Sequence, residues 1–232
     1  MENKYAQMEK NTVKATNQLK ENACVTFENP QGEGIKVMFV GNSITRHGIK
    51  EDIGWFWDHG MAASSKDKDY VHQLISKITP VHSDAAFCIC QVAEWETKYK
   101  TGENVLPLFE SARAFDADII VVRFVENCRV PETPEDAEIF KAEFAKLLDY
   151  LTPSGKAKFV TTTGFWRHPL DEKICEVASQ KNSPIVELGD LGEDDKMKAV
   201  GLFEHEGVAA HPGDLGMQTI AERIFEKLKD IL

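Results

Sequence analysis

The stretch "VMFVGNSIT", Val37 to Thr45, joins four consecutive apolar residues to a Gly-Asn-Ser turn. A short apolar run that ends in a turn is typical of a strand buried on both faces of a parallel sheet. The same rhythm repeats along the chain, which predicts strands within 35–40, 85–92, 118–125, 157–163 and 184–188, and helices within 68–78, 103–114, 134–151, 170–181 and 216–232. Strands that alternate with helices predict an α/β domain in which helices cover both faces of a five-stranded, mostly parallel sheet.

Length and charge restrict the classes of protein that this chain can belong to. With 232 residues, 42% of them hydrophobic, the chain can bury one sizeable core, and we expect residues 35–232 to form the domain behind a polar N-terminal extension, 1–34. A formal charge of -11 opposes binding to nucleic acid or to an anionic membrane. The charged N-terminus and the lack of a long apolar run predict a cytoplasmic protein, whose oligomeric state the sequence does not indicate.

Polar residues follow three of the predicted strands at the points where they end. Ser43 follows the first strand, Asn127 follows the third, and His211 precedes the last helix. In open α/β sheets the ligand site lies outside the carboxyl ends of the strands, so these side chains can meet there. A serine needs a base, and the oxyanion that forms on its attack needs fixed donors. Taken singly, each residue is more often a helix cap, a turn residue or a surface histidine.

Three short blocks strengthen the catalytic interpretation. "GNSIT", "ENC" and "HPGDLGM" resemble, in this order, the nucleophile, asparagine and histidine blocks of the SGNH, or GDSL-like, hydrolases. The resemblance covers about residues 35–232 and implies a three-layer α/β/α sandwich of flavodoxin-like fold. It also implies that Ser43 is the nucleophile, His211 the general base and Asn127 an oxyanion donor. We expect neither a metal nor a cofactor, because the His and acidic residues lack the spacing of a zinc site.

The chain departs from the family pattern at two positions. The family usually has a glycine after the second strand whose backbone N–H completes the oxyanion hole; here Ala93 stands near that place, and Gly60 is a second, weaker candidate. The acid of the triad normally lies three residues before the histidine, where this chain has Val208. Glu206 could replace it, or a backbone carbonyl near Val208 could hold the imidazole. We expect the carbonyl, and therefore a Ser-His dyad.

A long insert, residues 46–69, separates the serine block from the next helix, and loops of this length are often functional. Trp57 on this insert, with Trp95 and Trp166 from other strand ends, can line a substrate pocket or pack the loops onto the domain. The sequence therefore predicts a serine esterase that removes a short acyl group, such as acetyl, from a carbohydrate or small alcohol. The alternative is a catalytically impaired, flavodoxin-like protein that binds a glycan or nucleotide, although the phosphate-binding glycine patterns are missing.

Overall fold

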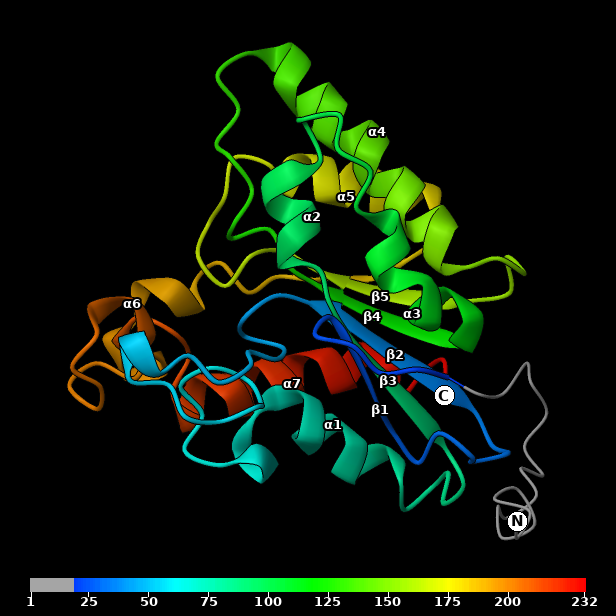
Figure 1. Ribbon diagram of the computed structural model, residues 1–232, viewed down its shortest axis with the longest axis horizontal. Helices are drawn as coiled ribbons and strands as arrows, with labels where there is room; N and C mark the ends of the chain where they lie inside the picture. The colour runs from blue at the N-terminus through cyan, green and yellow to red at the C-terminus, as the bar shows by residue number, and fades with distance from the viewer. Residues whose placement is uncertain (1–18) are drawn as a thin grey trace, which may run out of the picture.

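A computed structural model describes residues 19–232, which form a six-stranded sheet between two layers of helices (Figure 1). The strand order is β1-β3-β2-β4-β5-β6, and all neighbours are parallel except β1, which runs antiparallel to β3. The strands are β1 (Val25–Glu28), β2 (Lys36–Gly41), β3 (Ala86–Gln91), β4 (Ile119–Arg123), β5 (Lys158–Thr162) and β6 (Ile185–Val186). This arrangement confirms the predicted three-layer sandwich.

Helices α1 and α7 cover one face of the sheet, and α2 to α5 cover the other (Figure 1). The helices are α1 (Tyr70–Ile78), α2 (Ala93–Lys98), α3 (Glu110–Phe115), α4 (Pro134–Leu151), α5 (Asp171–Gln180), α6 (Glu206–Ala209) and α7 (Asp214–Leu228). Short 3-10 turns lie at η2 (Glu51–Ile53), η3 (Lys66–Lys68), η4 (Leu106–Phe109), η5 (Leu191–Glu193) and η6 (Asp195–Met197). No helix among residues 19–232 has the length and apolar character needed to cross a membrane.

The alternation of side chains along β2 explains why its sequence is apolar throughout. Met38 and Val40 enter the core beneath α2 to α5, whereas Val37 and Phe39 enter the core beneath α1 and α7. All four side chains are fully buried. A central strand with helices on both faces has no solvated side, so the polar alternation of an exposed strand is lost.

The observed sheet differs from the predicted one at its edges. The sixth strand, β1, lies inside the predicted extension 1–34 and pairs with β3, so the domain begins before residue 35. Only its first residue, Val25, is fully buried, which is why a four-residue edge strand gave no apolar signal. Residues 1–18 of that extension lie outside the described residues. At the other edge of the sheet, β6 has only two residues. The short helix α2, which follows β3, is absent from the elements that the sequence predicts.

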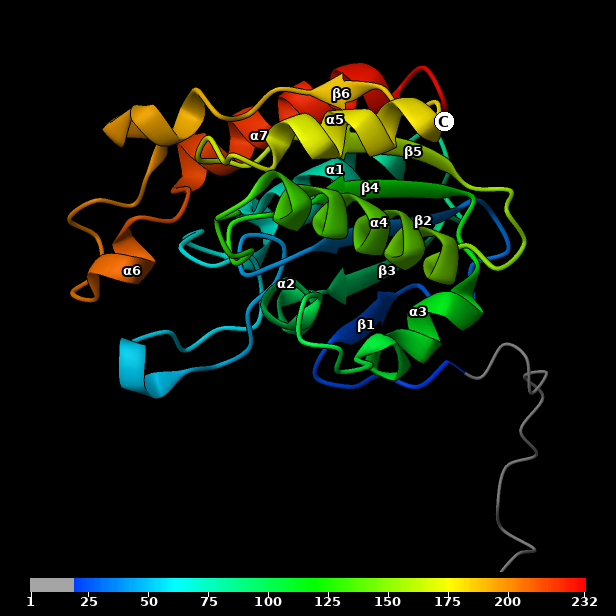
Figure 2. The ribbon, with the colours of Figure 1, turned by 90° about the horizontal axis from the view of Figure 1, so that it is seen from above.

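The long insert between β2 and α1 and the segment that carries α6 extend from the same side of the domain (Figure 2) and meet in one hydrophobic cluster. Trp55 on the insert is fully buried in a small separate cluster with Met61, Ala62, Ala199 and Val208. Its indole N–H donates to the carbonyl of His47 at 3.1 Å. Both segments project beyond the carboxyl ends of the strands, where the predicted site residues lie.

Candidate active site

Ser43 stands on a tight turn directly after β2. The amide N–H groups of Thr45 and Arg46 both donate to the carbonyl of Asn42, at 2.9 and 3.0 Å. Thr45 Oγ1 lies 2.7 Å from the buried Tyr70 hydroxyl, which ties the turn to α1. A Cβ at Gly41 would lie 1.7 Å from Thr45 Oγ1, so only glycine lets the strand turn this closely. The turn therefore presents Ser43 at the edge of the sheet.

His211 comes from the loop between α6 and α7 and meets Ser43 directly. Ser43 Oγ and His211 Nε2 are 2.8 Å apart, and His211 Nδ1 lies 2.6 Å from the carbonyl oxygen of Gly207. A carbonyl can only accept, so Nδ1 carries the proton and Nε2 keeps its lone pair for the serine hydroxyl. Burial lowers the pKa of His211 to about 4, which keeps the imidazole neutral near pH 7.

No carboxylate among residues 19–232 hydrogen-bonds to His211. Glu206, the first residue of α6, is exposed, and Val208 is buried in the cluster around Trp55. Asp214, the next acid after the histidine, accepts hydrogen bonds from both the backbone N–H and the hydroxyl of Ser64. The imidazole is therefore held by a backbone carbonyl, in the arrangement expected of a dyad.

The candidate oxyanion donors stand in different environments. One N–H of the Asn127 side-chain amide donates to Glu96 Oε2 at 2.7 Å, which leaves its second N–H for another acceptor. Ala93 begins α2, and its backbone N–H makes only a long contact, 3.3 Å, with the Gln91 side chain. Gly60 does not fit the expectation, because its N–H already donates to the buried Asp69 at 3.0 Å.

A buried polar network that the sequence did not suggest lies behind Ser43. Asn42 donates to Glu96 at 3.1 Å and to Glu126 at 2.6 Å, and accepts from Arg123 at 2.7 Å. Arg123 also pairs with Glu126 at 2.6 Å. Burial alone would raise the pKa of Glu126, but Arg123 and the Phe165 and Asn42 donors hold it below its usual value. Glu96 is fully buried as well.

The structure places the three tryptophans of the predicted pocket in different surroundings. Trp166 lies beside the histidine, with its ring edge-to-face to His211 at 6.0 Å between centroids. Trp57 is 44% exposed and contacts Trp55 edge-on. Trp95 is 2% exposed and packs among the core aromatic rings near Phe140, so its assignment to the substrate pocket is wrong. Trp95 lies on the face of α2 that packs against the core, and the sequence did not predict this helix.

Several solved structures share the fold of this chain. The chain resembles a two-domain esterase active on acetylated mannans (TM-score 0.52, 15% identity), covering 85% of this chain and 49% of that one. It also resembles a lipase/acylhydrolase from Enterococcus faecalis, with a TM-score of 0.52 and 14% identity over 84% of this chain and 96% of that one. A Bacteroides uniformis protein assigned to the GDSL-like lipases is similar to the same degree, with a TM-score of 0.52 and 15% identity over 84% of this chain and 96% of that one. The chain has the fold of a GDSL-like hydrolase. It spans about half the length of the mannan esterase.

Sequence comparison adds nothing to this structural likeness. No family model matches the chain, and no curated protein matches it. Identities of 14–15% to the hydrolases show the shared fold alone. The roles of Ser43, His211 and Asn127 therefore depend on the geometry described above.

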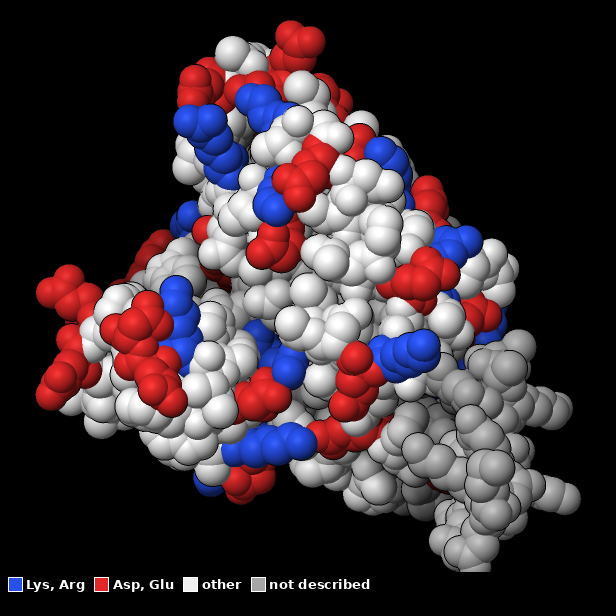
Figure 3. Space-filling view, in the orientation of Figure 1, with Lys and Arg blue, Asp and Glu red and all other residues white. Residues whose placement is uncertain are grey.

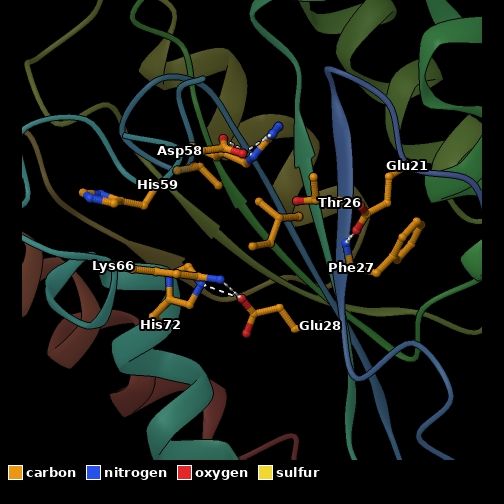
Figure 4. A pocket seen from close by; sticks show the side chains of 11 residues that line it. Glu21, Thr26, Phe27, Glu28, Asp58, His59, Lys66 and His72 are labelled. Atoms are coloured by element: carbon orange, nitrogen blue, oxygen red, sulfur yellow. Dashed lines mark hydrogen bonds and ion pairs between the residues drawn. The ribbon is translucent and has the colours of Figure 1, made fainter. Parts of the chain in front are cut away.

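A second polar cluster of this hydrolase fold lies apart from the serine, in a pocket between β1, the insert and α1 (Figure 4). The pocket has a volume of about 210 Å³ and contains neither Ser43 nor His211. His72 donates from Nδ1 to Asp69 and from Nε2 to Glu28, both at 2.8 Å. Lys66 also reaches Glu28, at 2.5 Å. These ion pairs fasten the edge strand β1 to α1.

Part of the negative charge on the visible surface lies near the projecting insert (Figure 3). Asp and Glu side chains gather over the tip formed by η2 and the segment at α6 (Figure 3), where Glu51, Asp52, Glu204 and Glu206 are exposed. No group of three or more His, Cys, Asp or Glu side chains is arranged to hold a metal ion within residues 19–232. The exposed carboxylates make the tip at η2 and α6 acidic.

Proposed function

We propose that the protein is a serine esterase that hydrolyses short-chain acyl esters through an acyl-enzyme. The observation that carries this proposal is the 2.8 Å contact between Ser43 Oγ and His211 Nε2, with Nδ1 of the same ring held by the Gly207 carbonyl. A hydroxyl next to a neutral, oriented imidazole is the arrangement that activates a serine nucleophile. The fold shared with esterases and acylhydrolases supports the same reaction class.

The first half of the reaction moves one proton. Ser43 Oγ attacks the ester carbonyl carbon while its proton passes to His211 Nε2. The negative charge that develops on the carbonyl oxygen is met by the free N–H of the Asn127 amide and by backbone N–H groups of Ser43 and Ala93. When the tetrahedral intermediate collapses, the bond to the alcohol oxygen breaks and His211 returns its proton to that oxygen.

Water completes the cycle by the same route. A water molecule loses its proton to His211 Nε2, attacks the acyl carbon and releases the carboxylic acid, and Ser43 regains the proton. The imidazolium formed in each step faces a carbonyl dipole at Gly207 rather than a carboxylate. Because a dipole stabilises that cation less than a full negative charge, the dyad gains less from this contact than a triad would.

We infer that the ester is uncharged and carried by a carbohydrate or another small alcohol. A net charge of -11 and the exposed carboxylates near η2 and α6 would repel an anionic ester. Trp166 beside the histidine and the exposed Trp57 offer faces on which a sugar ring can stack. The similar esterase active on acetylated mannans makes an acetylated sugar the first substrate to test.

Hydrolysis of p-nitrophenyl acetate tests the reaction class. The wild type should turn over this ester, and Ser43→Ala should reduce kcat by at least about 10³-fold with an unchanged circular dichroism spectrum. Ser76→Ala, at an exposed serine of α1, is the matched control and should keep full activity. A Ser43→Ala variant with most of the wild-type rate would exclude the serine mechanism.

A panel of acetylated mannan and xylan oligosaccharides beside p-nitrophenyl butyrate then identifies the alcohol and the acyl length. Release of acetate from a sugar with a higher kcat/KM than from the aryl ester supports the carbohydrate substrate. Binding of these sugars without any turnover by the wild type would favour the impaired binding protein instead.

A further inference from the structure

The buried Glu96 contacts both polar groups that frame the nucleophile. Its Oε1 accepts from Asn42, the residue before Ser43, at 3.1 Å and from the backbone N–H of Asn127 at 3.3 Å. Its Oε2 accepts from the Asn127 side-chain amide at 2.7 Å. One carboxylate thus holds the serine turn and the candidate oxyanion donor together.

The location of Glu96 makes this contact unusual. The side chain belongs to α2, a short helix at the end of β3, and is fully buried. Burying a carboxylate in such a place is costly unless donors surround it. The neighbouring acid on the same helix, Glu94, is half exposed and pairs with Lys98 at 3.2 Å instead. An apolar side chain at this position would avoid burying a charge but would leave the donors of Asn42 and Asn127 without this acceptor.

We propose that Glu96 is a positioning residue of the esterase, which orients the Asn127 amide toward the oxyanion and fixes the Asn42 side of the serine turn. This inference rests on the proposed function. An amide nitrogen has two hydrogens, and the bond from one of them to Glu96 Oε2 sets the direction in which the other points. Donors that are fixed in advance stabilise the developing charge more than donors that must reorient.

The ionisation of Glu96 determines whether it can hold both groups. Three donors converge on its two oxygens, so the ionised form satisfies all of them, whereas a protonated oxygen would face a donor. Burial, with Glu126 nearby, raises the pKa of Glu96 to about 7. The other titratable neighbour, Cys128, has its pKa raised well above the usual value by burial and stays neutral, and Arg123 is paired with Glu126.

Glu96 and His211 therefore titrate in different pH ranges. The Glu96 carboxylate is protonated as pH falls through about 7 and can then no longer accept all three hydrogen bonds. His211 stays neutral down to its pKa of about 4. We expect kcat of the wild type to fall to a lower plateau below about pH 7 and to fall again near pH 4. In Glu96→Gln the upper step should disappear.

Kinetics of four proteins test the assignment with p-nitrophenyl acetate between about pH 5 and pH 9: wild type, Glu96→Gln, Asn127→Ala and the double variant. Gln directs an N–H at one of the three donors, so Glu96→Gln should lower kcat by about tenfold or more with KM nearly unchanged. The double variant should be little slower than Asn127→Ala alone, because both changes remove the same donor. Glu94→Gln on the same helix is the control and should match the wild type.

Several outcomes would overturn the inference. One is a kcat of Glu96→Gln within about twofold of wild type, and another is retention of the step near pH 7 in the kcat profile of that variant. A third is a double variant whose loss in kcat equals the product of the losses of the two single variants. If Glu96→Gln does not fold, the side-chain amide NMR signals of Asn42 and Asn127 in the wild type decide. They should titrate together with a midpoint near pH 7. If the wild type hydrolyses no ester, the proposed function fails, and the same NMR titration still shows whether Glu96 holds both amides.

Discussion

Two partly buried histidines, His72 and His211, have opposite charge states in this molecule. Burial alone would lower the pKa of His72, but its bonds to Asp69 and Glu28 outweigh burial and raise the pKa to about 9. Burial lowers the pKa of His211 to about 4, and its partners are the Gly207 carbonyl and the Ser43 hydroxyl. The difference therefore comes from the carboxylates that hydrogen-bond to His72 and from the burial of His211 without such a partner.

The two histidines differ in role: His72 holds two elements together, whereas His211 can act as a base. A cationic His72 joins β1 to α1 through charge-assisted hydrogen bonds, and it has no free lone pair. A neutral His211 gains little binding from its carbonyl partner but keeps Nε2 able to accept a proton from serine. A missing triad acid therefore does not by itself indicate an inactive site.

Exchange of each histidine for glutamine should produce the largest difference in kcat between the two sites. His211→Gln should lower kcat for p-nitrophenyl acetate by about 10⁴-fold or more, because the proton acceptor is lost. His72→Gln should leave kcat within about threefold of wild type, because His72 contacts no reacting group. Equal losses in both variants would show that the two histidines do not differ in role.

Asn127→Ala should produce the next largest effect on the His211 side of the comparison. Loss of one oxyanion donor usually costs about 10²-fold to 10³-fold in kcat, and Asn127 has one amide N–H free for that purpose. Steady-state kinetics of the variant should show the loss in kcat. An effect confined to KM would instead make Asn127 a substrate-binding residue.

Glu206→Gln tests whether His211 lacks a carboxylate partner during the reaction as well. Glu206 is exposed and the imidazole N–H is already donated to Gly207, so kcat should fall by less than about tenfold. Glu204→Gln, a nearby exposed acid, is the control. A thousandfold loss with normal folding would mean that Glu206 reaches the imidazole and that His211 belongs to a triad.

The central layers of the fold could be predicted from the sequence because they obey one rule. Strands buried on both faces must be apolar throughout, as Val37 to Val40 are, and long amphipathic helices such as α4 separate them. The prediction of α4 matched its observed bounds, Pro134–Leu151. Short edge elements escape this rule, because β1 leaves most of its side chains half-buried and β6 spans two residues.

Part of the candidate site was predictable from the topology of the sheet, and part depended on contacts that the topology does not specify. Ser43 and His211 follow from topology, which brings the ends of the sheet together, and the structure places them in contact. Glu96 lies on a helical turn that local sequence did not reveal, and its role depends on long-range partners. Trp95 lies on the same unpredicted helix and is buried in the core. A strand end identifies a position, whereas burial there depends on what the rest of the chain packs against it.

The smallest expected effect concerns stability on the His72 side. A folded pKa of about 9, above the usual 6.5, means that His72 stabilises the fold fully below about pH 6.5 and loses this contribution as pH rises through 9. Glu28, whose pKa is lowered from 4.5 to about 2 mainly by its bond with His72, contributes above about pH 4.5 and loses that contribution as pH falls toward 2. Their joint contribution is therefore greatest between about pH 4.5 and 6.5.

Thermal unfolding of His72→Gln against wild type measures this contribution. The Tm of the variant should lie several degrees below that of wild type at about pH 6, and the gap should narrow toward pH 10, where His72 of the wild type is neutral. His82→Gln, which changes a histidine whose side chain makes no hydrogen bond within the described residues, should leave Tm unchanged at both pH values. A gap that stays constant from pH 6 to pH 10 would mean that His72 stabilises the protein by packing, since packing does not titrate. The two histidines would then differ in their partners without differing in charge.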